Sequence, residues 1–411
     1  MKRFICCALL AVLSPPAFGG EALTWEACVG EALDRNPDLA GAAESVWKAR
    51  SQHQASFSGF FPQLSASAGL SKTDSASSED YSLGLSARQS LFSGFKDKAG
   101  VERSAADLNS AEAGLQAALS NLGFQLQSAF SRLLYAQEQM KLAQIISERR
   151  GENVRLVELR YEAGREHKGS YLRSKAANRQ AEFEASQAKR ALRVAQRELA
   201  KALGRSEFDV IEVTGSFKTA SPEEAPEFRF LAARTPAVLQ AEAQTRAAEA
   251  GVAVSKSQLY PDIAASGSLS RRGSDWPPGS KNWSAGVSLS FPFFPGGRNI
   301  FDVKSALAEE RRSRAGQRSA ADQAALDLED KFAAFQDAAE QTEVRREFLD
   351  AAEVRAQIAR SQYTSGLLSF EDWDLIENDL ISGQKAMLAS LRDAVIARAG
   401  WERAQGKGLR P

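Results

Sequence analysis

The sequence predicts a mainly α-helical protein that also supplies four β-strands of the membrane-barrel type, built as two copies of one unit. Three patterns predict this fold class: runs of alternating apolar and small polar residues, long stretches with heptad spacing, and the return of both about 200 residues later. The clearest alternating runs are 64–71, LSASAGLS, and 263–270, IAASGSLS. Because side chains alternate sides along a strand, each run has one apolar face and one Ser/Gly face.

Four strands are expected, at 62–73, 80–92, 261–271 and 282–294. Their length is close to the roughly 9–11 residues that a tilted strand needs to cross a bilayer. Aromatic residues at both strand ends resemble the two girdles of an outer-membrane barrel: Phe60, Phe61, Phe92, Tyr260, Phe293 and Phe294 at one end, Tyr81, Trp276 and Trp283 at the other. The alternative is that these strands do not cross a membrane and instead form a soluble β-sandwich or a cap on a helical body.

Long helices are expected between and after the strands. The first helical stretch runs from Leu23 to about Gly59, and Asn36-Pro37 either kinks it or divides it in two. After Ser93-Gly94, a heptad seam predicts a helix of roughly 70 residues, about 100 Å long, that ends near Ala163-Gly164. A second helix, 170–203, returns antiparallel to it. The seam consists of Leu115, Leu119, Leu122, Leu126, Ala129 and Leu133.

The second half of the chain repeats the first. Thr235-Pro236 corresponds to Asn36-Pro37, and Tyr363-Thr364-Ser365-Gly366 to Tyr161-Glu162-Ala163-Gly164. The spacing between equivalent positions changes only in the tip of the second hairpin, which indicates a tandem duplication. We expect a first repeat at 21–203 with its helical tip near 163–169, a connector at 204–228, a second repeat at 229–406 with its tip near 365–372, and a tail at 407–411.

The N-terminus and the composition limit the class of protein. Residues 1–20 combine Lys2-Arg3, a short apolar core and small residues before Gly20, as in a secretory signal peptide. The mature chain then keeps one cysteine, Cys28, and no internal disulfide. Lys plus Arg equals Asp plus Glu, 52 each, and there are two histidines. We expect no nucleic-acid binding, no metal, no other cofactor and no enzymatic activity, since no nucleophile–base pair or phosphate loop is present.

Four strands cannot close a barrel, and open strand edges are not tolerated in lipid. Several chains must therefore contribute to one barrel if these strands cross a membrane. Two copies would give eight strands and three would give twelve, and the strand pattern favours neither number.

The order of these features resembles the TolC family of outer-membrane efflux proteins. The resemblance covers essentially the whole mature chain and rests on the secretion signal, Leu23-Thr24 with Ala32-Leu33 and Asn36-Pro37, Pro62 and Pro261 at the strand starts, the Phe291–Arg298 segment FPFFPGGR and the two Tyr-x-x-Gly motifs. The expected strand–helix junction residues are Pro62, Gly94, Pro261, Gly296 and Gly297. The resemblance implies a homotrimer with a twelve-stranded barrel in outer-membrane lipid, continued by an α-helical tunnel through the periplasm. It also implies a periplasmic adaptor, an inner-membrane transporter and an equatorial belt at 204–228.

Four carboxylates lie at the second-repeat tip, where such a tunnel narrows: Glu371, Asp372, Asp374 and Glu377. Rings of acidic side chains at an entrance favour cations. By the resemblance, Asp372 falls on the first acidic position of the family, whereas the second falls on Leu375, with Asp374 one place earlier. The alternative is that these acids only complement the N-terminus of the last helix.

The first-repeat tip is basic, with Arg165 and Lys168 near Tyr161 and Gly164. Polar contacts between the two tips are expected to hold a closed state, and both Tyr-x-x-Gly motifs, including Tyr363 and Gly366, are candidate adaptor contacts. Arg88 points to the Ser/Gly face of its strand, where it either lines the barrel lumen or is a neutral surface residue.

Together these features predict a passive exit duct of a tripartite efflux system, since nothing in the chain binds nucleotide. A closely related alternative is the outer-membrane component of type I protein secretion, and a more distant one is a periplasmic coiled-coil scaffold. The sequence does not identify the cargo.

Overall fold

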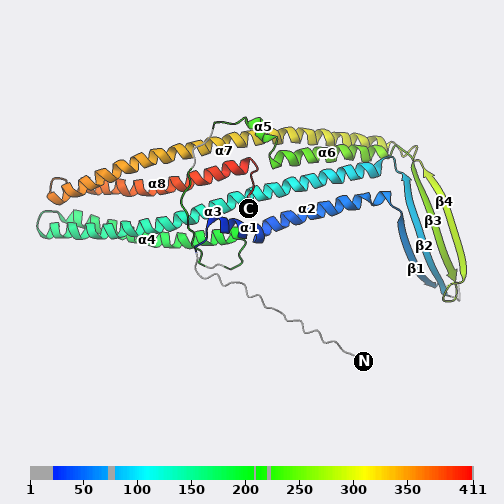
Figure 1. Ribbon diagram of the computed structural model, residues 1–411, viewed down its shortest axis with the longest axis horizontal. Helices are drawn as coiled ribbons and strands as arrows, with labels where there is room; N and C mark the ends of the chain where they lie inside the picture. The colour runs from blue at the N-terminus through cyan, green and yellow to red at the C-terminus, as the bar shows by residue number, and fades with distance from the viewer. Residues whose placement is uncertain (1–21, 73–78, 208–209, 220–223, 410–411) are drawn as a thin grey trace, which may run out of the picture.

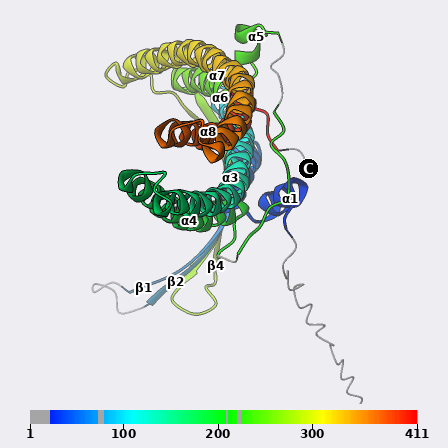
Figure 2. The same cartoon turned by 90° about the vertical axis from the view of Figure 1, so that its left-hand side faces the viewer.

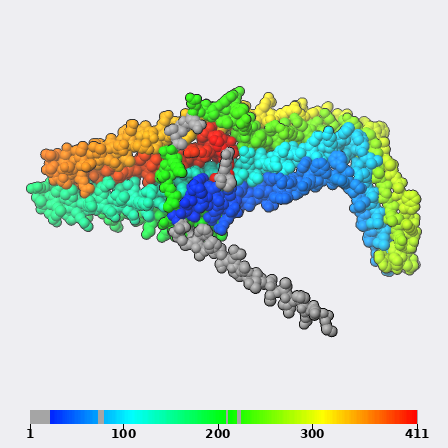
Figure 3. Space-filling view, in the orientation of Figure 1, coloured from blue at the N-terminus to red at the C-terminus, as the bar shows by residue number. Residues whose placement is uncertain are grey.

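The computed structural model describes residues 22–72, 79–207, 210–219 and 224–409. The expected signal peptide, 1–20, and the turn at 73–78 lie outside these residues. The described chain has two parts: an elongated body of helices, and a sheet at one end that turns away from the helix direction (Figures 1 and 3). None of the described helices contains a stretch long and apolar enough to cross a membrane.

The helical and strand composition predicted from the sequence is confirmed. In chain order the elements are α1 (Trp25–Arg35), α2 (Pro37–Ser56), a 3-10 turn (Phe57–Phe60), β1 (Gln63–Lys72), β2 (Glu79–Phe92), α3 (Lys96–Glu162), α4 (Lys168–Leu203), α5 (Phe228–Ala232), α6 (Pro236–Ser257), β3 (Asp262–Gly273), β4 (Ser280–Ser290), α7 (Arg298–Ser365) and α8 (Phe370–Ala404). The two longest helices, α3 and α7, have 67 and 68 residues. Asn36 divides the first helical stretch, because its side chain caps α2 by accepting from the Asp38 and Leu39 amides.

The sheet is antiparallel in the order β1-β2-β3-β4, so β1 and β4 are its two edges. Its register keeps the two faces chemically distinct. Leu64 pairs with Ala87 and Ala66 with Leu85 on the apolar face, which is largely exposed within one chain. On the other face serines meet across strands: the hydroxyls of Ser65 and Ser86 lie 2.6 Å apart.

The junctions between strands and helices use residues with restricted or unusual backbone conformations. Pro62 and Pro261 directly precede β1 and β3. Gly94 has φ +63°, and a side chain there would come within 2.6 Å of the Ser257 carbonyl oxygen, so only glycine fits. β4 ends at Ser290, four residues earlier than expected, because Pro292 has no N–H to continue the ladder.

The long helices form one curved layer. In the half near the tip the contacts give the order α4–α3–α8–α7, and in the half near the sheet α2–α3–α6–α7, so that α3 and α7 run through both halves. Seen end on, this layer follows an arc and does not close on itself (Figure 2). Like the sheet, it therefore has two free edges.

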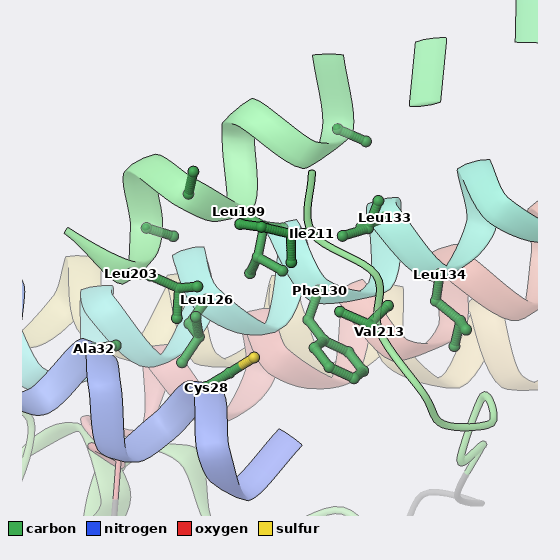
Figure 4. Close-up of a cluster of buried hydrophobic side chains, with 14 of the residues drawn as sticks. Cys28, Ala32, Leu126, Phe130, Leu133, Leu134, Leu199, Leu203, Ile211 and Val213 are labelled. Carbon is green, nitrogen blue, oxygen red and sulfur yellow. The ribbon is translucent and has the colours of Figure 1, made fainter. Parts of the chain in front are cut away.

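A hydrophobic core near the middle of the body joins α1, α3 and α4 to the connector (Figure 4). Val213 of the connector forms an isolated bridge with Leu23, and its backbone exchanges hydrogen bonds with the Gln137 side chain. Cys28 is fully buried here, and burial raises the pKa of its thiol to about 12. The connector thus packs across the helices and holds the N-terminal helix against them.

Candidate functional site

The two turns that join the paired long helices lie together at the end of the body opposite the sheet (Figure 1). Gly164 and Gly366 have φ +67° and +83°, the left-handed conformation that ends α3 and α7. The following helices begin with side-chain caps. Ser369 Oγ accepts the Asp372 amide at 3.1 Å, and His167 Nδ1 accepts the Ser170 amide at 3.2 Å.

Tyr363 is the centre of an aromatic cluster inside the tip. It is fully buried and stacks on Trp373, with ring centroids 4.3 Å apart and planes 9° apart. Phe370 packs edge-on against both rings, and Val157 of α3 closes the cluster. Burial of these large rings fixes the end of α7 against the start of α8, and both against α3.

Polar contacts connect the cluster to the first-repeat turn. Arg160 donates from Nη1 to the Tyr363 carbonyl oxygen at 2.6 Å, and its guanidinium lies 4.6 Å from the Tyr363 ring centroid. The Tyr363 hydroxyl donates to Glu166 at 3.1 Å. Burial, together with the Glu166 carboxylate, raises the pKa of Tyr363 well above its usual range, so this donor stays protonated.

A buried ion pair forms a second connection. Asp374 of α8 accepts hydrogen bonds from Arg150 of α3 at 3.1 Å and from Arg173 of α4 at 2.8 Å. The Asp374 and Arg150 side chains are only 6% and 7% exposed, whereas Arg173 is 67% exposed. The other end of Arg150 donates to Asn378 at 2.6 Å. One carboxylate thus ties three helices of one chain together.

A further ion pair links the same helices away from the tip. Lys385 of α8 lies 2.5 Å from Glu184 of α4. Burial works against ionisation of Glu184, but hydrogen bonds from Lys385 and Gln180 outweigh it and lower the pKa of this carboxyl. The contact is therefore present at neutral pH.

The four acids at the second-repeat tip have different environments. Glu371 and Asp372 are exposed in the first turn of α8. Asp374 and Glu377 are buried between helices of their own chain, at 5% and 3% exposure, so the expectation that all four surround an entrance is not met by these two. Asp374 forms ion pairs with Arg150 and Arg173. Glu377 Oε2 has no hydrogen-bond partner among the described residues.

The two Tyr-x-x-Gly motifs also differ, although they are equivalent in sequence. Tyr363 is buried, whereas Tyr161 is 37% exposed and stacks on Tyr171 of α4, with centroids 5.8 Å apart. Gly164, Arg165 and Lys168 are exposed, as is Gly366. The first-repeat motif therefore presents a surface, and the second-repeat motif forms the core of the tip.

Arg150, Arg160 and Arg173 were not singled out in the sequence, although Arg150 carries a detectable signal. Two buried positions of α3 near the tip, Arg150 and Val157, lie three and four heptads after Ala129 and so continue the apolar seam, and Ile146 and Asn153 are buried beside them. An arginine at a seam position needs a buried partner. The sequence does not show which acid supplies it, because Asp374 lies 224 residues away.

Arg88 lies on the Ser/Gly face of β2, as the alternation predicts, with its Nη2 3.8 Å from the Asp262 carboxylate. No group of three or more His, Cys, Asp or Glu side chains that could hold a metal ion occurs in the described part of the chain.

A family model described as outer membrane efflux protein matches two stretches of the chain, 28–205 and 230–406. The chain belongs to this family. Among curated relatives, the probable outer membrane lipoprotein SilC of Salmonella typhimurium is 26% identical over 381 residues, which covers 88% of this chain and 80% of SilC.

Solved structures of outer-membrane channels share the fold. A crystal structure of CusC superimposes with a TM-score of 0.82 at 20% identity and covers 93% of this chain and 92% of CusC. The open state of MtrE from Neisseria gonorrhoeae superimposes with a TM-score of 0.81 at 22% identity, covering 93% and 89%. As an outer membrane efflux protein, the chain is an exit duct in the outer membrane and not an enzyme.

Proposed function

We propose that three copies of this chain form the exit duct of a tripartite efflux system, with one twelve-stranded barrel and a continuous helical tunnel. The observation that carries this proposal is that both the sheet and the helical layer are open arcs with two free edges. A strand edge exposed to lipid leaves N–H and C=O groups unpaired, at a cost of several kcal/mol each. Pairing β4 of one copy with β1 of the next removes all such edges.

The edges of the helical layer carry exposed apolar side chains suited to the same closure. On α4, Leu172, Phe183 and Val194 are each more than half exposed and recur every 11 residues, which places them on one face about three turns apart. On α7, Phe348, Val354 and Ile358 are equally exposed. We propose that α4 of one copy packs against α7 of its neighbour, so that these side chains leave water.

The helix tips are the proposed gate. Three copies would bring Glu371 and Asp372 together in a ring of exposed carboxylates that favours cations. Inside each chain, the Tyr363 cluster and the Asp374 ion pairs hold the α7–α8 hairpin against the α3–α4 hairpin. The gate opens when the α7–α8 hairpin moves away, which requires these contacts to break.

The proposed duct has three kinds of partner. A periplasmic adaptor contacts the exposed first-repeat turn at Tyr161, Arg165 and Lys168, and an inner-membrane transporter supplies energy and selects the cargo. The apolar face of the sheet contacts outer-membrane lipid. The names of relatives such as the cation efflux system protein CusC favour small-solute efflux over type I protein secretion.

Charge reversal at Asp372 tests the proposed ring. The Asp372→Lys variant, reconstituted in planar bilayers, is expected to show a several-fold lower cation-to-anion permeability ratio, because each copy replaces a negative charge by a positive one at the narrowest point. Asp393→Lys is the control away from the tip, since Asp393 is an exposed acid about six turns further along α8, where it pairs with the adjacent Arg392. An unchanged reversal potential for Asp372→Lys would remove the ring from the proposal.

A further inference from the structure

Two basic side chains interrupt the apolar face of the sheet near its far end. The register pairs Leu83 with Arg271 and Arg271 with Lys281, and the adjacent row pairs Leu85 with Leu269 and Leu269 with Trp283. Directly paired residues of antiparallel strands project to the same face. Arg271 and Lys281 therefore stand side by side on the apolar face and not on the Ser/Gly face.

These two cations lack the ion pairs made by their neighbours. Arg272, on the opposite face, lies 3.6 Å from Asp80, and Lys72 lies 3.7 Å from Glu79. Within the described residues, neither Arg271 nor Lys281 has a carboxylate within ion-pair distance. Among the described residues, this end of the apolar face carries three cations, Lys72, Arg271 and Lys281, against Glu79 and Asp275 of the adjoining loop, which leaves one net positive charge.

The surroundings place the pair at the depth of lipid head groups. Arg271 is near the end of β3 and Lys281 near the start of β4, and these ends of the two strands are the ones farthest from the helices (Figure 1). Exposed Trp283 and the edge-on ring pair of Tyr81 and Trp276, whose centroids are 5.8 Å apart, lie at the same end. Aromatic residues of this kind mark a membrane–water interface. With the helices in the periplasm, this interface is that of the outer leaflet.

An apolar hollow begins one row away on the same sheet. It has a volume of about 490 Å³ and is bordered by Leu64, Leu85 and Leu269, with the small residues Ala66, Ala87 and Gly267 between them. Arg271 follows Leu269 by two residues on β3, which is about 7 Å along the strand. Arg271 and the hollow are thus close enough for one amphipathic ligand to place its anionic head at the cation and its apolar chain in the hollow.

We propose that Arg271 and Lys281 bind a phosphate group of an anionic lipid in the outer leaflet, whose acyl chain lies in the hollow at Leu64, Leu85 and Leu269. The inference rests on the proposed function, because it requires the apolar face to contact lipid. It assigns a lipid site to each chain, at the level of the membrane surface.

Lipid titration of the full chain tests the site. The purified protein is reconstituted in phosphatidylcholine nanodiscs and titrated with lipid A, which carries phosphates, and with dephosphorylated lipid A. Each basic side chain next to an anionic surface contributes a factor of about 5, so Arg271→Gln/Lys281→Gln is expected to weaken lipid A binding about 30-fold. Arg272→Gln, the matched control on the opposite face, is expected to bind like the wild type, and Arg271→Lys is expected to retain most of the affinity.

Two results would overturn the inference: equal affinity of the double glutamine variant and the wild type for lipid A, or equal binding of the dephosphorylated lipid. Complete competition by inorganic phosphate at the concentration of the lipid would also overturn it, because the site would then be a simple anion site. Conductance of the same samples separates this inference from the proposed function. Pores without selective lipid binding reject only the lipid site, whereas a wild type that forms no pore rejects the duct.

Discussion

Replacing Asp374 by alanine is expected to open the helix tips and to lower their free energy of unfolding by about 3–5 kcal/mol. Arg150 would remain buried with only the Asn378 oxygen as partner, and an uncompensated buried charge is far more costly than a lost surface contact. The loss of stability is measured by hydrogen exchange of the backbone amides, which is expected to be faster at the start of α8 and around Arg150 in α3. Raised single-channel conductance would measure the opening.

Arg173→Gln is the matched control for this variant. Arg173 binds the same carboxylate but is largely exposed, so its loss is expected to lower the free energy of unfolding far less than the loss of Asp374. If Asp374→Ala exchanged its tip amides and conducted like the wild type, the buried pair could not be what holds the hairpins together. Equal effects of both variants would show that burial of Arg150 does not decide the cost.

Replacing Tyr363 by alanine is expected to destabilise the tip by about 3–5 kcal/mol, the usual cost of removing a buried aromatic side chain. The variant loses the stacking on Trp373, the Arg160 guanidinium over the ring and the hydrogen bond to Glu166. Tyr363→Phe keeps the ring and loses only the hydroxyl contact, so its cost is expected to be about 1 kcal/mol. Denaturant unfolding, monitored by amide hydrogen exchange at the tip, distinguishes the cost of Tyr363→Ala from that of Tyr363→Phe.

Tyr161→Ala is the control that the duplication provides. Tyr161 occupies the equivalent sequence position, but it is exposed and its ring stacks on Tyr171. Its removal is therefore expected to lower the free energy of unfolding much less than the removal of Tyr363. Similar losses at Tyr161 and Tyr363 would contradict the asymmetry of the two tips.

Periodicity in the sequence was enough to predict most of the fold. Alternation at 64–71 and 263–270 requires strands, and the heptad seam from Leu115 to Leu133 requires a long helix, because both patterns reflect side chains that share one face of one element. The end of β4 was predicted less well. Phe291, Phe293 and Phe294 continue an aromatic pattern, but Pro292 cannot take part in the ladder.

The candidate site was predicted only in its location. Four acids within seven residues suggested a common role, yet helical geometry turns Asp374 and Glu377 inward and leaves Glu371 and Asp372 outside. Pairs such as Asp374 with Arg150 depend on how α8 lies against α3, and local sequence carries no information on that packing. The same packing buries Tyr363 while its counterpart Tyr161 stays exposed.

The most direct test of the proposed duct is the conductance of the purified full-length protein in planar lipid bilayers, wild type beside Asp374→Ala. We predict discrete channel steps of low conductance for the wild type and larger steps for Asp374→Ala, because in the proposed duct three chains close one barrel and the proposed gate at the tips restricts it. Bilayers that remain silent with both proteins, although each is incorporated, would contradict the conclusion that this chain forms a channel.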